Sequence, residues 1–389
     1  MRSLLRLLAV GAVALLPWTT TDAQWATVAK QYFYPASHNW QFRTWYPAAD
    51  RLFNAFDYGH AIISEVLLTH DSARAVPRLE GREYDYITGT LLRNPPRLPI
   101  EEAAVMLTYV RLAPEAKFMF EWAHVLHRQV YDVLADRRLT RAQQDSAVDV
   151  IWRFYRSRPD LAFSAVPKSM ALMQEQWFSL AFRQAYPTMN GLIWAYHWLQ
   201  MGLYEPLVVG RTEEDRQAGI ATAVARFRQM LDGAPDGFPV VMPMTPAIAP
   251  AFTARWPHLG AVFDNLHSMH DVVSDILANP RVPAADKRRL ILEAGRAYRD
   301  DTTEAMTIDA WKRMAVGMGV ENQGGPAVGL MPALPTPTMA RGAVMKHDRD
   351  GNPVGAHGHH HHPVTQDTLK KPPVPKDSTG GARAASLPR

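Results

Sequence analysis

The chain has 389 residues, no cysteine, and a formal net charge of +4 at neutral pH. Without cysteine, disulfides, catalytic thiolates and cysteine-ligated zinc or iron–sulfur sites are excluded. The positive charge lies at the two ends, because residues 24–319 carry equal numbers of acidic and basic side chains. A neutral body lacks the basic surface that binds nucleic acid, so we expect no nucleic-acid partner.

The first 23 residues have the composition of a secretory signal peptide. A basic start with Arg2 and Arg6 precedes an apolar run at residues 7–17, and the small residue Ala23 follows. We expect cleavage after Ala23 and a secreted or periplasmic protein. No later run reaches the roughly 18 apolar residues of a membrane-spanning helix, so no transmembrane span is expected in the mature chain.

Helical periodicity dominates residues 24–319, and strand-like alternation is nearly absent. Helices are predicted at residues 48–68, 100–112, 114–135, 140–156, 169–185, 190–204, 212–231, 263–277, 284–299 and 302–316. A proline-rich stretch at residues 233–250 suggests a break between two lobes, and no internal repeat of fixed period is found. The sequence therefore predicts an all-α bundle of about nine to eleven helices.

From residue 320 onward the chain is rich in proline, glycine and small polar residues. Such a composition buries too little apolar surface to offset the entropy of ordering, so residues 320–389 are predicted to be a flexible tail. Contiguous imidazoles bind transition metals, and the tail contains such a segment: His357, His359, His360, His361 and His362.

Two predicted helices each place a histidine in the middle of an apolar stripe. His60 has Asp57 three residues before it, and His270 has His267 at the same spacing. Side chains three residues apart share a helix face and can meet one metal ion. Each histidine taken alone is more often a core residue with a hydrogen bond on each ring nitrogen than a metal ligand. The recurrence of the pattern on two helices favours the metal site.

A third helix contains the segment FEWAHVLHRQVYD at residues 120–132. Glu121 and His124 share one face there, but it is not the apolar face of this helix. This face lies either in solvent or beneath a second layer of helices, and His124 and His127 are expected at the surface rather than as ligands when each is taken alone. His197 lies in a helix that is hydrophobic almost all round, which is typical of a buried central helix.

Glu121 and His124 have the Glu-x-x-His spacing, and Asp57 and His60 match it with Asp in place of Glu. This pattern resembles the carboxylate-bridged di-iron proteins of the ferritin-like type over a few helical turns. The pair at residues 267 and 270 departs from that pattern, with His where Glu is expected. The resemblance implies ligands from several helices around iron.

The leading hypothesis is a secreted or periplasmic all-α metalloprotein with a histidine and carboxylate site between helices. If it is an enzyme, its reaction is expected to be an iron-dependent oxidation–reduction. Iron is preferred, with zinc, manganese or copper as alternatives, and no glycine-rich phosphate-binding motif supports a nucleotide cofactor. The alternatives are a non-catalytic scaffold or subunit of a cell-envelope complex, and metal capture by the histidine-rich tail alone. The candidate ligands are His60, Glu121, His124 and His270, with Asp57, His197 and His267 as ligands or supporting residues.

Overall fold

The computed structural model describes residues 40–100, 102–329 and 333–354. The predicted signal peptide and the histidine-rich segment at residues 357–362 lie outside these residues. The all-α prediction is confirmed: the strands in the described part are only β1 (Lys346–His347) and β2 (Pro353–Val354), which pair antiparallel. No helix within the described residues has both the length and the apolar character needed to cross a membrane.

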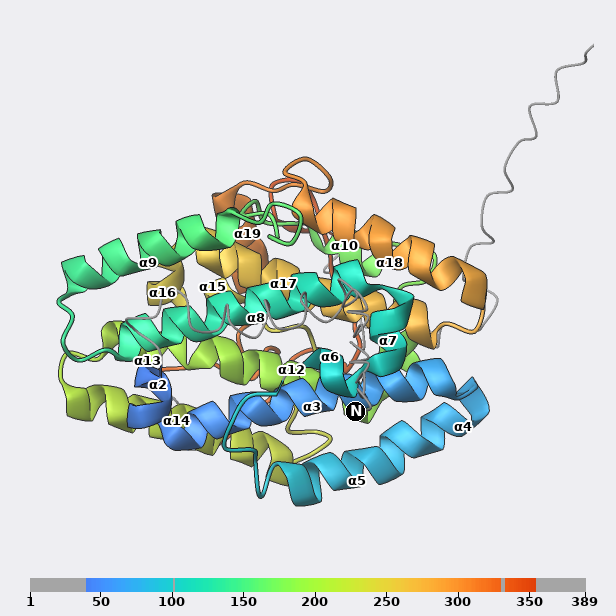
Figure 1. Cartoon of the computed structure of the whole chain (residues 1–389), viewed down its shortest axis with the longest axis horizontal. Coiled ribbons are helices and arrows are strands. Elements are labelled where there is room, and N and C mark those ends of the chain that lie inside the picture. Colours follow the sequence, from blue (N-terminus) through green and yellow to red (C-terminus); the bar gives the residue numbers. More distant parts are fainter. Residues whose placement is uncertain (1–39, 101, 330–332, 355–389) are drawn as a thin grey trace, which may run out of the picture.

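Four long helices pass through the middle of the molecule (Figure 1): α3 (Pro47–Thr69), α8 (Pro114–Ala135), α12 (Pro187–Gly202) and α17 (Pro257–Ala278). Each begins with proline, which the first helical turn accepts because its N–H would have no partner there. A short helix precedes each one: α2 (Gln41–Trp45), α7 (Leu107–Leu112), α11 (Ala181–Ala185) and α16 (Pro250–Arg255). The residue before each proline breaks the helix in the same way, with φ between −145° and −131° and ψ between 55° and 69°.

An outer helical segment follows each long helix. Two of these lie along one side of the bundle in Figure 1: α9 (Arg141–Arg156) and α18 (Ala284–Arg299). On the other side lie α14 (Glu213–Asp232) and a segment of α4 (Ser72–Pro77), π-helical turns (Arg78–Glu83 and Ile87–Leu91) and α5 (Tyr84–Tyr86). The chain thus repeats one unit four times: short helix, proline, long helix, outer helix. The initial prolines are 67, 73 and 70 residues apart, so the unit recurs without the fixed period for which the sequence was searched.

Carboxylates hold the repeats together in pairs. Asp132, eighteen residues after the proline of α8, accepts the backbone N–H groups of Trp40 (3.1 Å) and Phe42 (2.8 Å) at the start of α2. Glu65 has the same position in α3 and accepts the N–H of Thr108 (2.6 Å) at the start of α7. The first two repeats therefore cap each other's short helices, where helix N–H groups otherwise lack partners.

The third and fourth repeats show the same exchange. Asp275 of α17 accepts the N–H groups of Leu180 (2.9 Å) and Phe182 (2.8 Å) beside α11. Glu205, eighteen residues after the proline of α12, accepts the N–H of Ala251 (3.0 Å) in α16. Aspartate caps the short helices of the first and third repeats, and glutamate caps those of the second and fourth. The second half of the bundle therefore has the same arrangement of caps as the first half.

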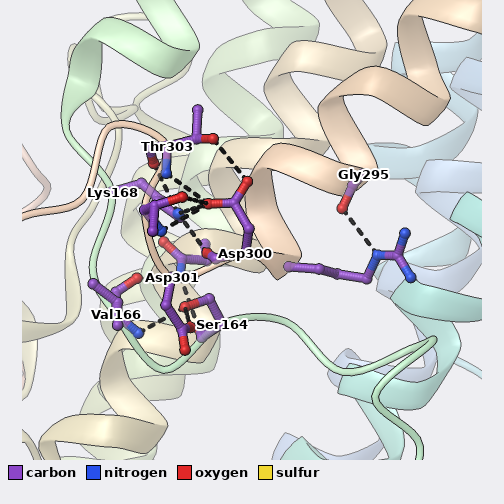
Figure 2. A network of polar contacts seen from close by, with 10 residues as sticks. Ser164, Val166, Lys168, Gly295, Asp300, Asp301 and Thr303 are labelled. Atoms are coloured by element: carbon purple, nitrogen blue, oxygen red, sulfur yellow. Dashed lines mark hydrogen bonds and ion pairs between the residues drawn. The ribbon is translucent and has the colours of Figure 1, made fainter.

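The remaining helices are short: α6 (Glu102–Val105), α10 (Met170–Gln174), α13 (Tyr204–Val209), α15 (Thr245–Ile248) and α19 (Ile308–Gly317). The linker between the two halves is tied to the loop after α18 (Figure 2). Lys168 donates to the carbonyl oxygens of Asp300 (2.6 Å) and Thr303 (2.8 Å). Ser164 donates to the carboxylate of Asp301 (2.6 Å). These contacts attach the linker to the second half of the bundle.

Residues 320–329 and 333–354 pack against the helices, so the predicted start of the flexible tail is too early. Gln323 is fully buried; it donates to the carbonyl oxygen of Ala315 (2.7 Å) and accepts the N–H of Met244 (2.9 Å). Arg341 donates to the carbonyl oxygen of Phe238 (3.1 Å), within the proline-rich stretch expected to separate two lobes. The two stretches of unusual composition thus supply each other's hydrogen bonds, and Phe238 belongs to the same cluster of buried side chains as the long helices.

Candidate metal centre

The buried faces of the four long helices carry polar residues at two repeated positions, ten and thirteen residues after each initial proline. These residues are Asp57 and His60 on α3, His124 and His127 on α8, His197 and Gln200 on α12, and His267 and His270 on α17. None is more than 9% exposed. Because residues three apart face the same way, all four helices direct imidazoles to one interior. We call the six histidines the histidine chamber.

Three imidazoles of the chamber converge from three helices. His60, His124 and His270 each offer a ring nitrogen, and these nitrogens all lie within 4.8 Å of one another. The ring centroids are 4.1 Å apart for His60 and His270, 5.7 Å for His124 and His270, and 6.2 Å for His60 and His124. A first-row metal ion binds imidazole nitrogen at about 2.0–2.1 Å, so these three rings, the first trio, fit around one ion.

The other three histidines lie beside the first trio. The rings of His197 and His267 stack with centroids 4.0 Å apart, and that of His197 lies 5.9 Å from His270. His127, which the sequence placed at the surface, is fully buried with its ring 6.0 Å from His267. Its position thirteen residues after a proline, shared with His60 and His270, was the sequence signal that could have revealed it.

The electrostatics of the chamber favour the neutral form of four of its imidazoles. Burial lowers the pKa of these four well below the usual value, and neighbouring imidazoles lower it further: His127, His197, His267 and His270. Neutral imidazole is the form that binds metal ions. Among the described residues, Nδ1 of His270 has no hydrogen-bond partner, and a buried polar atom in that state costs about 1–3 kcal/mol. A metal ion would remove this cost.

The two candidate carboxylates are buried but do not join the first trio. Glu121 lies 3.3 Å from the ammonium group of Lys117, and both side chains are at most 2% exposed. Asp57 accepts a hydrogen bond from Arg128 at 2.9 Å. The FEWAHVLHRQVYD segment therefore faces the interior, and cations on its own helix hold both carboxylates. The converging group thus lacks the carboxylates that the di-iron resemblance implies.

A small pocket reaches the first trio. It has a volume of about 30 Å³, and its wall combines apolar side chains with six polar ones: His60, Ser64, Tyr109, His270, Asp271 and Ser274. A single water needs about 10–15 Å³ measured in this way, so the pocket admits a molecule of one or two heavy atoms. His60 and His270 are also the most exposed members of the chamber, at 9% and 8%. Small molecules thus have their approach on this side.

Comparisons of the chain with protein-family models, with curated proteins and with solved structures gave no match. The functional argument therefore depends on the geometry of the chamber.

Proposed function

We propose that this protein is a metalloprotein whose transition-metal ion is held by His60, His124 and His270. The observation that carries the proposal is the convergence of their ring nitrogens within 4.8 Å in a buried site. Imidazole ligands suit iron, zinc, copper and nickel, and of the divalent series copper binds most tightly. The preference for iron drew on Glu121 and Asp57, and because both are paired with cations, copper and zinc become equally suitable.

We further propose oxidation–reduction of a small molecule as the reaction. Three protein ligands leave coordination positions open on an ion of four or more ligands, and the pocket of about 30 Å³ beside His60 and His270 leads to them. When iron or copper is bound, the ion would supply the electron-transfer chemistry. The pocket's size restricts the reactant to a molecule such as dioxygen and leaves room for few water molecules. Secretion or a periplasmic location, inferred from residues 1–23, is part of the same proposal.

The scaffold hypothesis expects histidines that are scattered and bonded to nearby carbonyl groups. The convergence of three rings from three helices supports the metal site instead. A cell-envelope partner and metal capture by the tail remain separate predictions that concern other parts of the chain.

Elemental analysis after reconstitution tests the metal site. Contiguous histidines can bind metal ions, so the test uses a full-length chain in which the five tail histidines are replaced by asparagine, the tail-substituted chain. It is prepared without an affinity tag, loaded with Fe²⁺, Cu²⁺, Zn²⁺ or Co²⁺ in turn, and passed through a desalting column. We expect at least one retained equivalent, and at least a tenfold weaker affinity after His60→Ala, His124→Ala or His270→Ala.

The matched control is His258→Ala. His258 also lies on α17, but its ring packs against Trp152, with centroids 4.8 Å apart, outside the chamber. Equal metal retention in the control and in the three chamber variants would overturn the proposed function.

A further inference from the structure

The three histidines outside the first trio are its most deeply buried companions. His127, His197 and His267 have no exposed surface, and they come from α8, α12 and α17. We propose that they form a second transition-metal site, so that the chamber holds two ions. This inference extends the proposed function, but its ligands are separate from the first trio.

Hydrogen bonding leaves these rings incomplete. Among the described residues, neither ring nitrogen of His197 or His267 has a hydrogen-bond partner, and Nε2 of His127 also has none. A neutral imidazole carries one N–H donor and one lone pair, and burying such groups without partners is costly. One metal ion would engage a nitrogen of each ring and remove three of these five deficits together.

The remaining nitrogen of His127 shows how this ring is prepared. Nδ1 lies 2.7 Å from the hydroxyl oxygen of Tyr204, which also lies 3.2 Å from the backbone carbonyl oxygen of His127. The hydroxyl has one proton, and donating it to the carbonyl lets its oxygen accept the N–H of Nδ1. This arrangement leaves the lone pair on Nε2, the atom without a partner. Histidine ligands of metals are typically oriented by such a hydrogen bond on the other nitrogen.

The repeat relates the second site to the first. Between the two halves of the bundle, His127 is equivalent to His270, and His267 is equivalent to His124. Gln200 is equivalent to His60, is 1% exposed, and has no hydrogen-bond partner for its side-chain amide among the described residues. The site related to the first trio by this repeat thus keeps two of its three ligands, His127 on α8 and His267 on α17. His197, one turn before Gln200, supplies the third imidazole.

Among the described residues, only the first trio brings three ligand nitrogens within 4.8 Å of one another, so the rings of the second site must move when an ion binds. The ring centroids of His127 and His267 are 6.0 Å apart, within the range for two ligands of one ion, whose ring centres each lie about 3.2 Å from it. The rings of His197 and His267 are stacked, with planes 12° apart. One of them must turn about its Cβ–Cγ bond for both lone pairs to meet, and this torsion has a broad preference in histidine.

The two sites would be neighbours. His124 and His127 would serve different ions, as would His267 and His270, and three residues of helix correspond to a rise of about 4.5 Å. Two ions on the order of 5 Å apart are close enough for two Cu²⁺ ions to broaden or quench each other's electron paramagnetic resonance signal.

Titration with Co²⁺ tests the second site, because its visible absorption reports binding to nitrogen ligands. The tail-substituted chain should bind two equivalents of Co²⁺. In that chain, His197→Leu and His267→Leu should each reduce binding to one equivalent, and the His258→Leu control should still bind two. Tyr204→Phe preserves the packing and should weaken only one equivalent, by about 10- to 100-fold. Loading with Cu²⁺ should give less integrated signal than two isolated ions, and His197→Leu should restore the signal of one.

Three outcomes are decisive. The second site would be overturned if the tail-substituted chain itself bound only one equivalent, and if that equivalent remained in His197→Leu and His267→Leu but was lost in His270→Leu. This result would leave the proposed function intact. No equivalent at all would overturn both. Thermal unfolding with a chelator identifies a variant that fails to fold; His197→Leu should unfold no earlier than the unsubstituted apoprotein, because leucine removes a buried polar ring. Should that variant fail to fold, the response to Tyr204→Phe decides the question.

Discussion

Replacing Asp275 by alanine should lower the free energy of unfolding by about 3 kcal/mol. The carboxylate accepts two backbone N–H groups, from Leu180 at 2.9 Å and Phe182 at 2.8 Å. Removing the carboxyl group leaves both N–H groups without an acceptor, and each buried group in that state costs about 1–3 kcal/mol. Burial raises the pKa of Asp275 to about 7, so at pH 6 the lost acceptor is largely uncharged and a cost in the lower half of the summed range applies. Asp132→Ala should cost the same within about 1 kcal/mol, because the repeat gives Asp132 the same two bonds.

Urea denaturation followed by circular dichroism at pH 6 measures both variants. The matched control is Asp286→Ala: this aspartate lies in the first turn of α18 and contacts exposed Arg289 at 3.1 Å. Exposed pairs of this kind contribute about 0–1 kcal/mol. If Asp275→Ala and Asp132→Ala cost no more than this control, the carboxylates do not hold the repeats together and the reasoning fails.

Three further predictions concern buried charges. Burial raises the pKa of Asp264 from 3.8 to about 7, so its contribution to stability falls as pH rises from about 4 to 7. Asp264→Asn should remove that contribution from the pH dependence of urea stability, whereas an unchanged slope would contradict it. Lys117→Met should cost about 3–5 kcal/mol in urea denaturation by leaving the Glu121 carboxylate buried without its lysine, and Lys117→Met/Glu121→Leu should recover at least half; a smaller loss in the single variant would argue against the ion pair. Lys168→Met should cost about 2–3 kcal/mol in the same assay, since two carbonyl oxygens lose a charged donor, and a cost below about 1 kcal/mol would count against it.

Periodicity was sufficient to predict the four long helices, three of the four outer helices and the inward direction of two histidines. It missed the outer segment at residues 72–91 and joined α10 and α11 into one helix. His60 and His270 lie in apolar stripes, and in the structure their helices bury those stripes against one core. The same reasoning was less informative for α8, because this helix is buried on nearly every side. A buried ion pair between Lys117 and Glu121 looks, in sequence, like the charged face of a surface helix. Only the second layer of helices around α8 distinguishes the two cases.

The fourfold repeat could not be predicted from residue identity. The repeats share the initial proline, the polar character of two inward positions and one carboxylate, while the intervening side chains differ. Glu65 illustrates the difficulty: its side chain points away from His60, and its carboxylate is bound by groups outside its own helix. Its partner is the N–H of Thr108, forty-three residues further along the chain. Reciprocal capping of this kind depends on tertiary contacts, which periodicity within one helix does not contain.

The departures from the repeat explain why the chamber would hold two unlike sites. Eight inward positions could all have been histidine, but Asp57 and Gln200 replace it at non-equivalent positions of the two halves. The carboxylate of Asp57 accepts a hydrogen bond from Arg128. A guanidinium group thus lies beside this inward position, at which a histidine would have been a further metal ligand. The first trio therefore borders the pocket through His60, while its counterpart has an amide at that position and lies where no side chain is exposed. A reactant would reach only the first ion. The second ion would lie in the fully buried site about 5 Å away, close enough to exchange electrons with the first.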